Sequence, residues 1–484
     1  ASAASAAAEE APARVFDMFT DDVRPLAVDT KPREATPPPN PEATPVAVDP
    51  PAPPPAVAFR RAVPFAVAVV PAAIVATAVV AVAAVAAAAA PGVGGSTVGD
   101  DGSFAAASGA VLAGRYRVEA TLGRGVFATV LRCLDLHALA VNAADATRGA
   151  PKLVQVVALK VCRADAARSA RAAADREIAA LRAIDLHFSK HAYDSSALQA
   201  RQHIAKLVDA LDVGRHRALV MEVLHHDLRR VAKKHKSSTT PQPFGLGGLP
   251  LETMQLYTGQ LFHALKHVHA AGLVHLDVKP DNVVLDAARG RCVLCDFGSA
   301  AFVHDLQRAH KKAPSAYVQS RFYRAPEVPL GVGPLTGRAD VWALGVTLAE
   351  VATGRLMLTG RDNHALLRAT VSALGPPPSG LVDRGRHSDK HFIAVHPAAG
   401  ATGYALRRRP GSSEHDSATK APARPLSLVL AYREDDGRRP RDGDSRIAAQ
   451  FLELIERTLS WDPDRRISAD DALKFAFVRP APAP

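Results

Sequence analysis

The chain has 484 residues, of which 48% are hydrophobic and 22% are charged, which allows one large two-lobed domain with tails or two to three average domains. Its net charge is +11, but residues 1–110 hold 11 acidic and 6 basic residues, so the remainder is strongly basic. Basic charge favours acidic or phosphorylated partners, with a plain solvated surface as the alternative. Four cysteines are too few for a disulfide framework and indicate a reducing compartment.

The N-terminal region is of low complexity. Residues 1–58 combine alanine with proline runs such as PPPNPEATP, which predicts a disordered or polyproline tract. Residues 62–99 carry no charge and exceed the length of about 20 residues that spans a bilayer. Because they are mostly alanine and contain prolines, a low-complexity tract is favoured and a membrane anchor at 63–90 is the alternative. Residues 92–114 are predicted to be a Gly/Ser/Ala linker, and 1–114 as a whole a disordered extension.

Strand patterns begin after residue 115. YRVEATLGRGVFATVLRCLD alternates apolar and polar residues around a glycine pair, which predicts strand, tight turn and strand over 116–135. LVQVVALKVC at 153–162 predicts a third strand, and HIAKLVDAL and RALVMEVL predict two more. ARSARAAADREIAALRAI has apolar residues at helical spacing, which predicts a helix over 167–184. Together these elements predict a small, mostly antiparallel lobe.

Helices are predicted to dominate after residue 224. LETMQLYTGQLFHALKHVHAAG places its apolar residues on one face and ends at a glycine. Its three histidines lack a carboxylate or cysteine partner, so solvated or capping histidines are preferred to a metal site; they are His263, His267 and His269. Strand packing is likewise preferred to a zinc site or a redox pair for the CxxC of Cys292 and Cys295. Residues 376–446 form a polar, Arg-rich insertion that we expect to be mobile in part.

Candidate catalytic and metal-binding residues concentrate in VHLDVKPDNVVLDAARGRCVLCDFG, residues 274–298. An Asp, a Lys and an Asn follow one another in HLDVKPDN, and a second Asp precedes Phe-Gly. This pattern indicates phosphoryl transfer, in which Asp277 would orient the acceptor hydroxyl and Lys279 would neutralise charge on the transferred group. Asn282 and Asp296 would offer oxygen ligands to Mg²⁺, which is a hard cation.

Residues upstream are suited to bind a nucleotide. Gly123 and Gly125 form a GxGxxA turn whose backbone N–H groups could approach phosphates closely, with Phe127 at its tip. Lys160 in VALK would clamp the phosphates, and Glu177 on the next helix would fix its flexible side chain. The alternative is a plain hairpin and a lysine at a strand end.

The motifs together resemble a eukaryotic protein kinase over residues 115–479. They are GxGxFxxV, VALK, HxDxKPDN, DFGSA, SRFYRAPE, DVWALG and DPxxRIS. SRFYRAPE and the insertion are similar to the CMGC group, and within it the chain is most similar to the pre-mRNA-processing serine/threonine kinases that act on the spliceosome. The dual-specificity tyrosine-regulated kinases are neighbours. The resemblance implies an α+β bilobal fold, with a β-rich lobe over 115–222 and a helical lobe over 223–479 that contains the 376–446 insertion.

The resemblance also assigns roles to single residues. Tyr317 matches an autophosphorylated activation-loop tyrosine, and Arg321 matches the arginine that meets its phosphate. Glu327 and Arg466 match the ion pair that anchors the activation segment, and Asp340 matches the carboxylate that steadies the catalytic loop. The implied catalytic residues are Asp277, Lys279 and Lys160. The implied nucleotide-binding residues are Leu122, Gly123, Gly125, Phe127, Val130, Ala158, Lys160, Glu177, Met221 as gatekeeper, and Glu222 and Leu224 in the hinge.

Two departures from the family pattern are visible. Leu276 replaces the usual arginine of HRD, and an aliphatic side chain cannot pair with a phosphate; the spliceosomal family also lacks an arginine there. The extension is acidic and Ala/Pro-rich, whereas that of the family is basic and Ser/Arg-rich, which puts recruitment to the spliceosome in doubt.

The expected function is ATP- and Mg²⁺-dependent phosphorylation of protein Ser/Thr hydroxyls in the nucleus, with splicing factors as candidate partners and no direct nucleic-acid binding. One alternative is a membrane-anchored kinase of the same group. The other is a kinase-fold scaffold, which would be marked by loss of Lys160, Asp277 or Asp296, and all three are retained.

Overall fold

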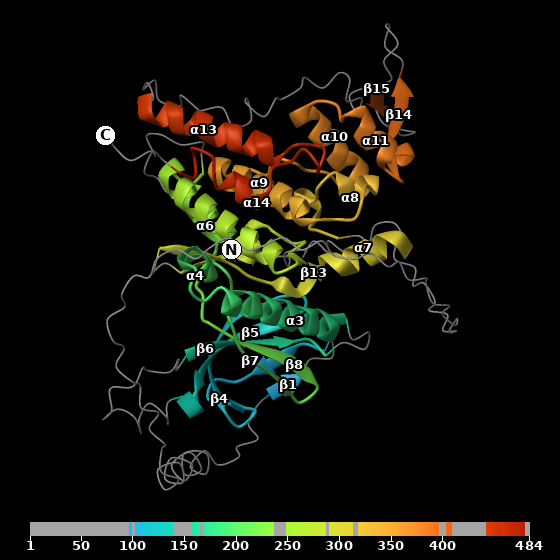
Figure 1. The fold of residues 1–484 in the computed structure, drawn as a ribbon. Helices are drawn as coiled ribbons and strands as arrows, with labels where there is room; N and C mark the ends of the chain where they lie inside the picture. Colours follow the sequence, from blue (N-terminus) through green and yellow to red (C-terminus); the bar gives the residue numbers. More distant parts are fainter. Residues whose placement is uncertain are drawn as a thin grey trace, which may run out of the picture. The chain divides into compact units, whose positions relative to one another are not determined.

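The computed structural model describes residues 96–98, 102–138, 156–164, 169–236, 248–286, 290–312, 318–395, 403–408 and 442–479 (Figure 1). The proline-rich tract, the candidate membrane segment at 63–90 and Tyr317 lie outside this part of the chain. Within it, no helix combines the length and the apolar character needed to cross a membrane.

A six-stranded antiparallel sheet, in the order β3-β4-β5-β6-β8-β7, forms the first part of the described fold. Alternate residues of β5 are buried, as the period-two pattern predicts. Leu131 of β5 and Leu159 of β6 pack in one apolar cluster on a single face of the sheet, which directs Val130 and Lys160 to the opposite face. The strands are β3 (Val111–Leu112), β4 (Tyr116–Arg124), β5 (Ala128–Asp135), β6 (Val156–Cys162), β7 (Leu207–Val213) and β8 (His216–Met221).

The linker predicted for 92–114 is wrong over the described part of this segment. β1 (Ser96–Val98) pairs with β2 (Phe104–Ala106), and Phe104 is 3% exposed within the apolar cluster of the sheet. The Oγ1 of Thr129 on β5 donates a hydrogen bond to the carbonyl oxygen of Phe104 at 2.8 Å. Phe104 is the one aromatic residue in this Ala/Gly/Ser-rich stretch, and the burial of its ring outweighs the composition that suggested a linker.

Helix α3 (Ser169–Lys190) packs against the sheet and carries the predicted helical pattern (Figure 1). Ile178, Leu181 and Ile184 lie on its buried face, as their spacing predicts. The helix extends beyond the predicted end at residue 184 because Phe188 continues the buried stripe.

Helices dominate the second part of the fold, as predicted, and the α+β class is confirmed. Every residue of α9 from Ala339 to Thr353 is buried, as expected for a helix surrounded by protein. Thr336 caps the start of the helix, because its Oγ1 accepts a hydrogen bond from the N–H of Arg338, and Gly354, whose φ is 63°, caps its end. The helices of this part and the short helix that follows α3 are α4 (Ser195–Arg201), α5 (Leu228–Lys236), α6 (Leu251–Ala270), α7 (Val303–Lys312), α8 (Glu327–Leu330), α9 (Gly337–Thr353), α10 (Asn363–Leu374), α11 (Ser379–Arg384), α13 (Asp442–Thr458) and α14 (Ala469–Ala472).

Two histidines of α6 correct the prediction of solvated or capping side chains. His267 is buried, its ring stacks on Phe188 with centroids 5.1 Å apart, and burial lowers the pKa of His267 to about 4. The Nε2 of His269 lies 2.9 Å from Oδ2 of Asp340. Among the residues that the structure describes, no group of three or more His, Cys, Asp or Glu could hold a metal.

Short strands and turns connect these helices. β11 pairs with both β9 and β12, and β10 pairs with β13. These strands are β9 (His226–Asp227), β10 (Leu273–Val274), β11 (Val283–Asp286), β12 (Arg291–Leu294) and β13 (Ala301–Phe302). The 3-10 turns are η1 (Pro280–Asn282), η2 (Phe297–Ser299), η3 (Arg321–Tyr323) and η4 (Ser388–Lys390).

The described part of the 376–446 insertion is folded. It contains α11 and a hairpin of β14 (Phe392–Val395) and β15 (Gly403–Leu406). Phe392 packs with Leu381 and Trp461 in an apolar cluster of its own. Because Trp461 follows α13, this cluster attaches the beginning of the insertion to the helical part of the fold.

Candidate active site

The ammonium group of Lys160 on β6 joins two other elements. Its Nζ lies 2.7 Å from Oε2 of Glu177 on α3 and 3.0 Å from Oδ1 of Asp296, which precedes η2. Burial alone would lower the pKa of Lys160, but the two carboxylates outweigh burial and raise it, so the ammonium stays charged. Burial also acts to raise the pKa of Asp296, yet Lys160 holds it below its ordinary value. The structure thus brings together three residues from three separate motifs.

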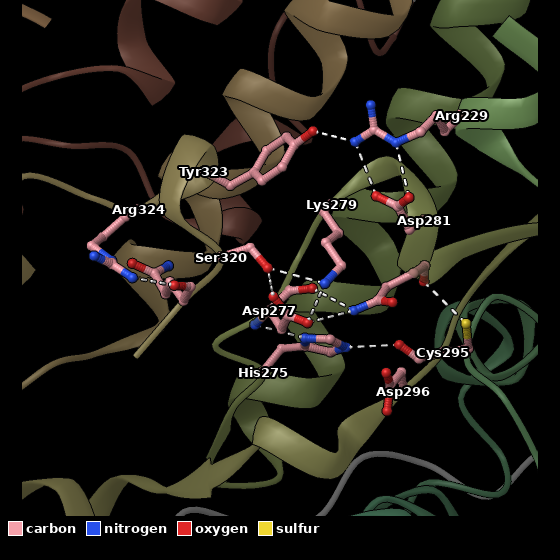
Figure 2. A network of polar contacts seen from close by, with 12 residues as sticks. Arg229, His275, Asp277, Lys279, Asp281, Cys295, Asp296, Ser320, Tyr323 and Arg324 are labelled. Atoms are coloured by element: carbon pink, nitrogen blue, oxygen red, sulfur yellow. Dashed lines mark hydrogen bonds and ion pairs between the residues drawn. The ribbon is translucent and has the colours of Figure 1, made fainter. Parts of the chain in front are cut away.

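Asp277 lies in the loop between β10 and η1, where both of its carboxylate oxygens accept hydrogen bonds (Figure 2). Its Oδ2 accepts from Nζ of Lys279 at 2.8 Å and from Nδ2 of Asn282 at 2.9 Å. Its Oδ1 accepts from Oγ of Ser320 at 2.6 Å, and Lys279 Nζ also donates to this hydroxyl at 3.0 Å. The carboxylate of Asp277 is therefore held in one orientation and already receives a hydroxyl group.

Asp340 of α9 binds the backbone of the two residues that precede Asp277 in the sequence. Its carboxylate accepts hydrogen bonds from the N–H groups of His275 and Leu276, both at 2.8 Å, and contacts His269. Leu276 has a φ of 63°, in the left-handed region that branched side chains rarely adopt, and is buried. The hydrogen bonds to Asp340 offset the cost of this strained backbone.

Asn282 and Asp296, the predicted Mg²⁺ ligands, are brought close through the backbone. The N–H of Cys295, next to Asp296, donates to the carbonyl oxygen of Asn282 at 2.9 Å. The Asn282 side chain uses its amide nitrogen on Asp277, so its amide oxygen is the atom suited to bind a cation. The Asp296 side chain is 46% exposed. An amide oxygen and a carboxylate fit Mg²⁺, which binds few protein ligands and retains water.

The CxxC pair has structural contacts. Cys292 is buried in β12, and the Sγ of Cys295 donates to the carbonyl oxygen of Asn282 at 3.3 Å. Burial raises the pKa of both thiols, and for Cys295 the charge of Asp296 raises it further. Both cysteines are free thiols; Cys292 packs within β12 as predicted, whereas Cys295 lies directly after the strand.

The predicted nucleotide-binding residues of the strands share the face that carries Lys160. The strand register places Val130 opposite Lys160 and Ala158 opposite Met221. These four residues therefore line one continuous patch of the sheet.

The glycine turn connects β4 and β5 at the edge of this patch. The N–H of Gly125 donates to the carbonyl oxygen of Ala128 at 2.8 Å, which closes the turn. Leu122 and Phe127 are exposed on either side of it, and Gly123 lies within β4. The turn thus has the predicted form, with apolar side chains that a ligand could cover.

The predicted hinge follows β8. Oε2 of Glu222 accepts a hydrogen bond from Nη2 of Arg291 at 2.9 Å, which links this segment to β12. The side chain of Glu222 is thereby engaged within the protein, so a ligand would meet the backbone from Glu222 to Leu224.

A buried ion pair anchors the segment that precedes α9. Nη1 and Nη2 of Arg466 lie 2.7 and 2.8 Å from the carboxylate oxygens of Glu327, and the guanidinium lies over the ring of Trp342 at 5.0 Å. Nη1 of Arg321, the residue implied to meet a phosphate, donates to the carbonyl oxygen of Arg361 at 2.6 Å. Its expected partner Tyr317 lies outside the described residues.

A network around Arg229 of α5 was not predicted (Figure 2). Its guanidinium donates two hydrogen bonds of 2.9 Å to Asp281 in η1, and further bonds to Tyr323 and Glu350. The Tyr323 hydroxyl donates to Glu350, and burial raises the pKa of Tyr323. Ser320 was missed in the same way. The partners of both residues are distant in sequence, and no local pattern marks such pairs.

Comparisons with known proteins agree with this geometry. The sequence model of the family described as Protein kinase domain matches residues 116–478. The chain is 26% identical to serine/threonine-protein kinase prpf4B of Dictyostelium discoideum over 76% of this chain and 40% of that protein. It is 26% identical to serine/threonine-protein kinase prp4 of Schizosaccharomyces pombe over 75% of this chain and 66% of that protein.

A further relative is dual specificity tyrosine-phosphorylation-regulated kinase 3 of Rattus norvegicus, with 28% identity over 77% of this chain and 56% of that protein. The predicted resemblance to the CMGC group, between the pre-mRNA-processing and the tyrosine-regulated kinases, is confirmed. The alignment covers less than half of the Dictyostelium protein and under two thirds of the rat protein.

We predict that Glu327→Ala lowers the free energy of unfolding by about 3–5 kcal/mol, because it leaves the buried Arg466 guanidinium without its carboxylate. Chemical denaturation would measure the change. Arg384→Ala is the matched control, since Arg384 pairs with Asp462 and Asp464 at the surface and its loss should cost about 0–1 kcal/mol. Equal small losses in both variants would contradict the structural role of the buried pair.

Proposed function

Because this chain belongs to the protein kinase domain family, we propose that it transfers the γ-phosphoryl group of ATP to serine and threonine hydroxyls of proteins. The observation that carries the proposal is the Asp277 carboxylate, which accepts a hydroxyl hydrogen bond from Ser320 at 2.6 Å while Lys279 and Asn282 hold its other oxygen. A carboxylate oriented in this way can receive an acceptor hydroxyl in the same manner.

In the proposed reaction, the acceptor oxygen bonds to the γ-phosphorus as the bond to the ADP oxygen breaks, and Asp277 takes the acceptor proton. Lys279 lies 2.8 Å from Asp277 and would stabilise the charge of the transferred group. The charged Lys160 would hold the phosphates, and Glu177 would keep its side chain in place. Asn282 and Asp296 would bind Mg²⁺, which neutralises phosphate charge when it is bound.

The nucleotide is proposed to lie against the sheet face that carries Lys160. The backbone of the glycine turn would meet the phosphates, and Val130, Ala158 and Met221 would contact the base. With the change of lobe proposed at residues 222–223, this surface would lie at the junction of the two lobes.

For its substrates, we propose proteins of pre-mRNA splicing and a nuclear location. Both rest on the resemblance to the pre-mRNA-processing kinases and on the similarity to the prpf4B and prp4 kinases. Leu276 supports this branch because the position lacks the phosphate-pairing arginine, as in that family. The basic charge of the chain after residue 110 suits acidic or phosphorylated partners.

We predict that Asp277→Asn lowers kcat by about 10²- to 10⁴-fold, because the amide cannot accept the acceptor proton. The KM for ATP should change little, since Asp277 does not hold the nucleotide in this mechanism. Transfer of labelled phosphate from ATP to a generic basic protein, at several ATP concentrations, would measure kcat and the KM for ATP, and omission of Mg²⁺ is a further control. Asp305→Asn on the exposed face of α7 is the control, and near-normal turnover by the Asp277 variant would refute the mechanism.

For the substrates, replacing Lys160 with Met should abolish phosphorylation of splicing proteins in cells. Quantitative phosphoproteomics would compare this variant with Lys266→Met, which removes a surface lysine paired with Asp470. Phosphorylation sites lost only in the Lys160 variant should be enriched in splicing factors. Losses confined to other proteins would contradict the splicing assignment and leave the kinase activity in place.

Tyr317 should carry phosphate in protein expressed in bacteria, as the resemblance to the tyrosine-regulated kinases implies. Mass spectrometry of the wild-type chain and of Asp277→Asn would test this, because self-modification requires the active site of the chain, whereas modification by a bacterial kinase would persist in the variant. An active enzyme with unmodified Tyr317 would remove autophosphorylation from the proposal.

A further inference from the structure

The segment from Gly102 to β2 lies on the face of the sheet opposite Lys160, which we call the outer face, and it contacts β5 next to the glycine turn. Thr129 of β5 is 4% exposed and donates from Oγ1 to the carbonyl oxygen of Phe104 at 2.8 Å. Its neighbours Ala128 and Val130 belong to the turn and to the face that carries Lys160. A hydrogen bond on the face opposite Lys160 therefore holds Thr129, the second residue of β5, directly after the turn.

A second contact ties the same segment to the tip of the turn. The N–H of Arg163 donates to the carbonyl oxygen of Phe127 at 2.8 Å, and the N–H of the next residue, Ala164, donates to that of Gly102 at 3.1 Å. Successive peptide groups after β6 thus hold the turn and the segment together. Gly102 has a φ of 76°, and a Cβ there would lie 2.7 Å from the Ala164 carbonyl oxygen, so this close approach requires glycine.

The third contact reaches the strand of Lys160. The ring of Phe104 meets that of His216 edge-on, with centroids 5.0 Å apart. Nδ1 of His216 donates to the carbonyl oxygen of Cys162 at 2.9 Å, two residues after Lys160. The segment therefore contacts β5 directly and the end of β6 through His216, and these two strands carry Val130 and Lys160.

We propose that residues 102–106 act as a positioning strap for nucleotide binding: through Thr129 and Ala164 they hold the glycine turn in the conformation that receives the phosphates of ATP. The proposal rests on the kinase function proposed above and adds to it residues that lie before the predicted kinase domain. Thr129 and Gly102 are positioning residues, because they act through the turn and touch no substrate.

Two substitutions in the full chain test the strap without removing apolar volume from the core. Thr129→Val removes the hydroxyl, and Gly102→Ala forces the strap away from Ala164. Each should speed amide hydrogen exchange of residues 123–128. Each should also weaken binding of adenylyl imidodiphosphate with Mg²⁺ by about threefold to tenfold, the effect of losing one buried hydrogen bond. The KM for ATP should rise with the dissociation constant, while the KM for the acceptor protein and kcat stay near wild type.

Ser108→Ala is the matched control, because Oγ of Ser108 also donates to a backbone carbonyl, that of Glu119 on β4, at an exposed site. It should change neither the exchange of the turn nor nucleotide binding. Unchanged exchange in both test variants would overturn the proposal, and so would an equal rise in the KM for ATP and for the acceptor. If the wild-type chain transfers no phosphate but both test variants speed exchange of the turn, the proposed function fails and the hold of the strap on the turn stands.

Discussion

The charged Lys160 between Glu177 and Asp296 is the interaction on which the rest of the site depends. An ammonium removed from water is costly unless it is paired, and its two partners come from α3 and from the segment before η2. The apolar stripe of α3 therefore serves the site as well as the core, because a shift of the helix by one turn, about 5.4 Å, would remove Glu177 from reach.

The opposite half of the site is held by the core of the helical part. Asp340 lies on a helix that is buried on all sides, and it accepts hydrogen bonds from the successive backbone N–H groups of His275 and Leu276. This support allows Leu276 to keep a left-handed backbone, and Asp277 follows it with both carboxylate oxygens bonded. Preorganised polar groups of this kind need little rearrangement during a reaction.

Short-range patterns predicted most of the elements and the chemical residues of the site. Strand alternation, helical spacing and the HLDVKPDN and DFG motifs depend on neighbours in sequence, and such signals survive in a single chain. Sequence patterns did not predict the contacts of Arg229, Ser320 and His269. Their partners lie dozens of residues away, and only the packing of the folded chain brings them together. Composition predicted a linker around Phe104, whereas the single buried ring of this residue orders a stretch that is otherwise rich in Ala, Gly and Ser.

The thiol of Cys295 has a consequence for chemical probes. It lies directly before Asp296, next to the proposed nucleotide site, where an electrophilic inhibitor would be aimed. The thiolate is the reactive form, and burial together with the negative charge of Asp296 disfavours it. Its hydrogen bond to the Asn282 carbonyl adds to this protection. We therefore expect electrophiles to react slowly with Cys295.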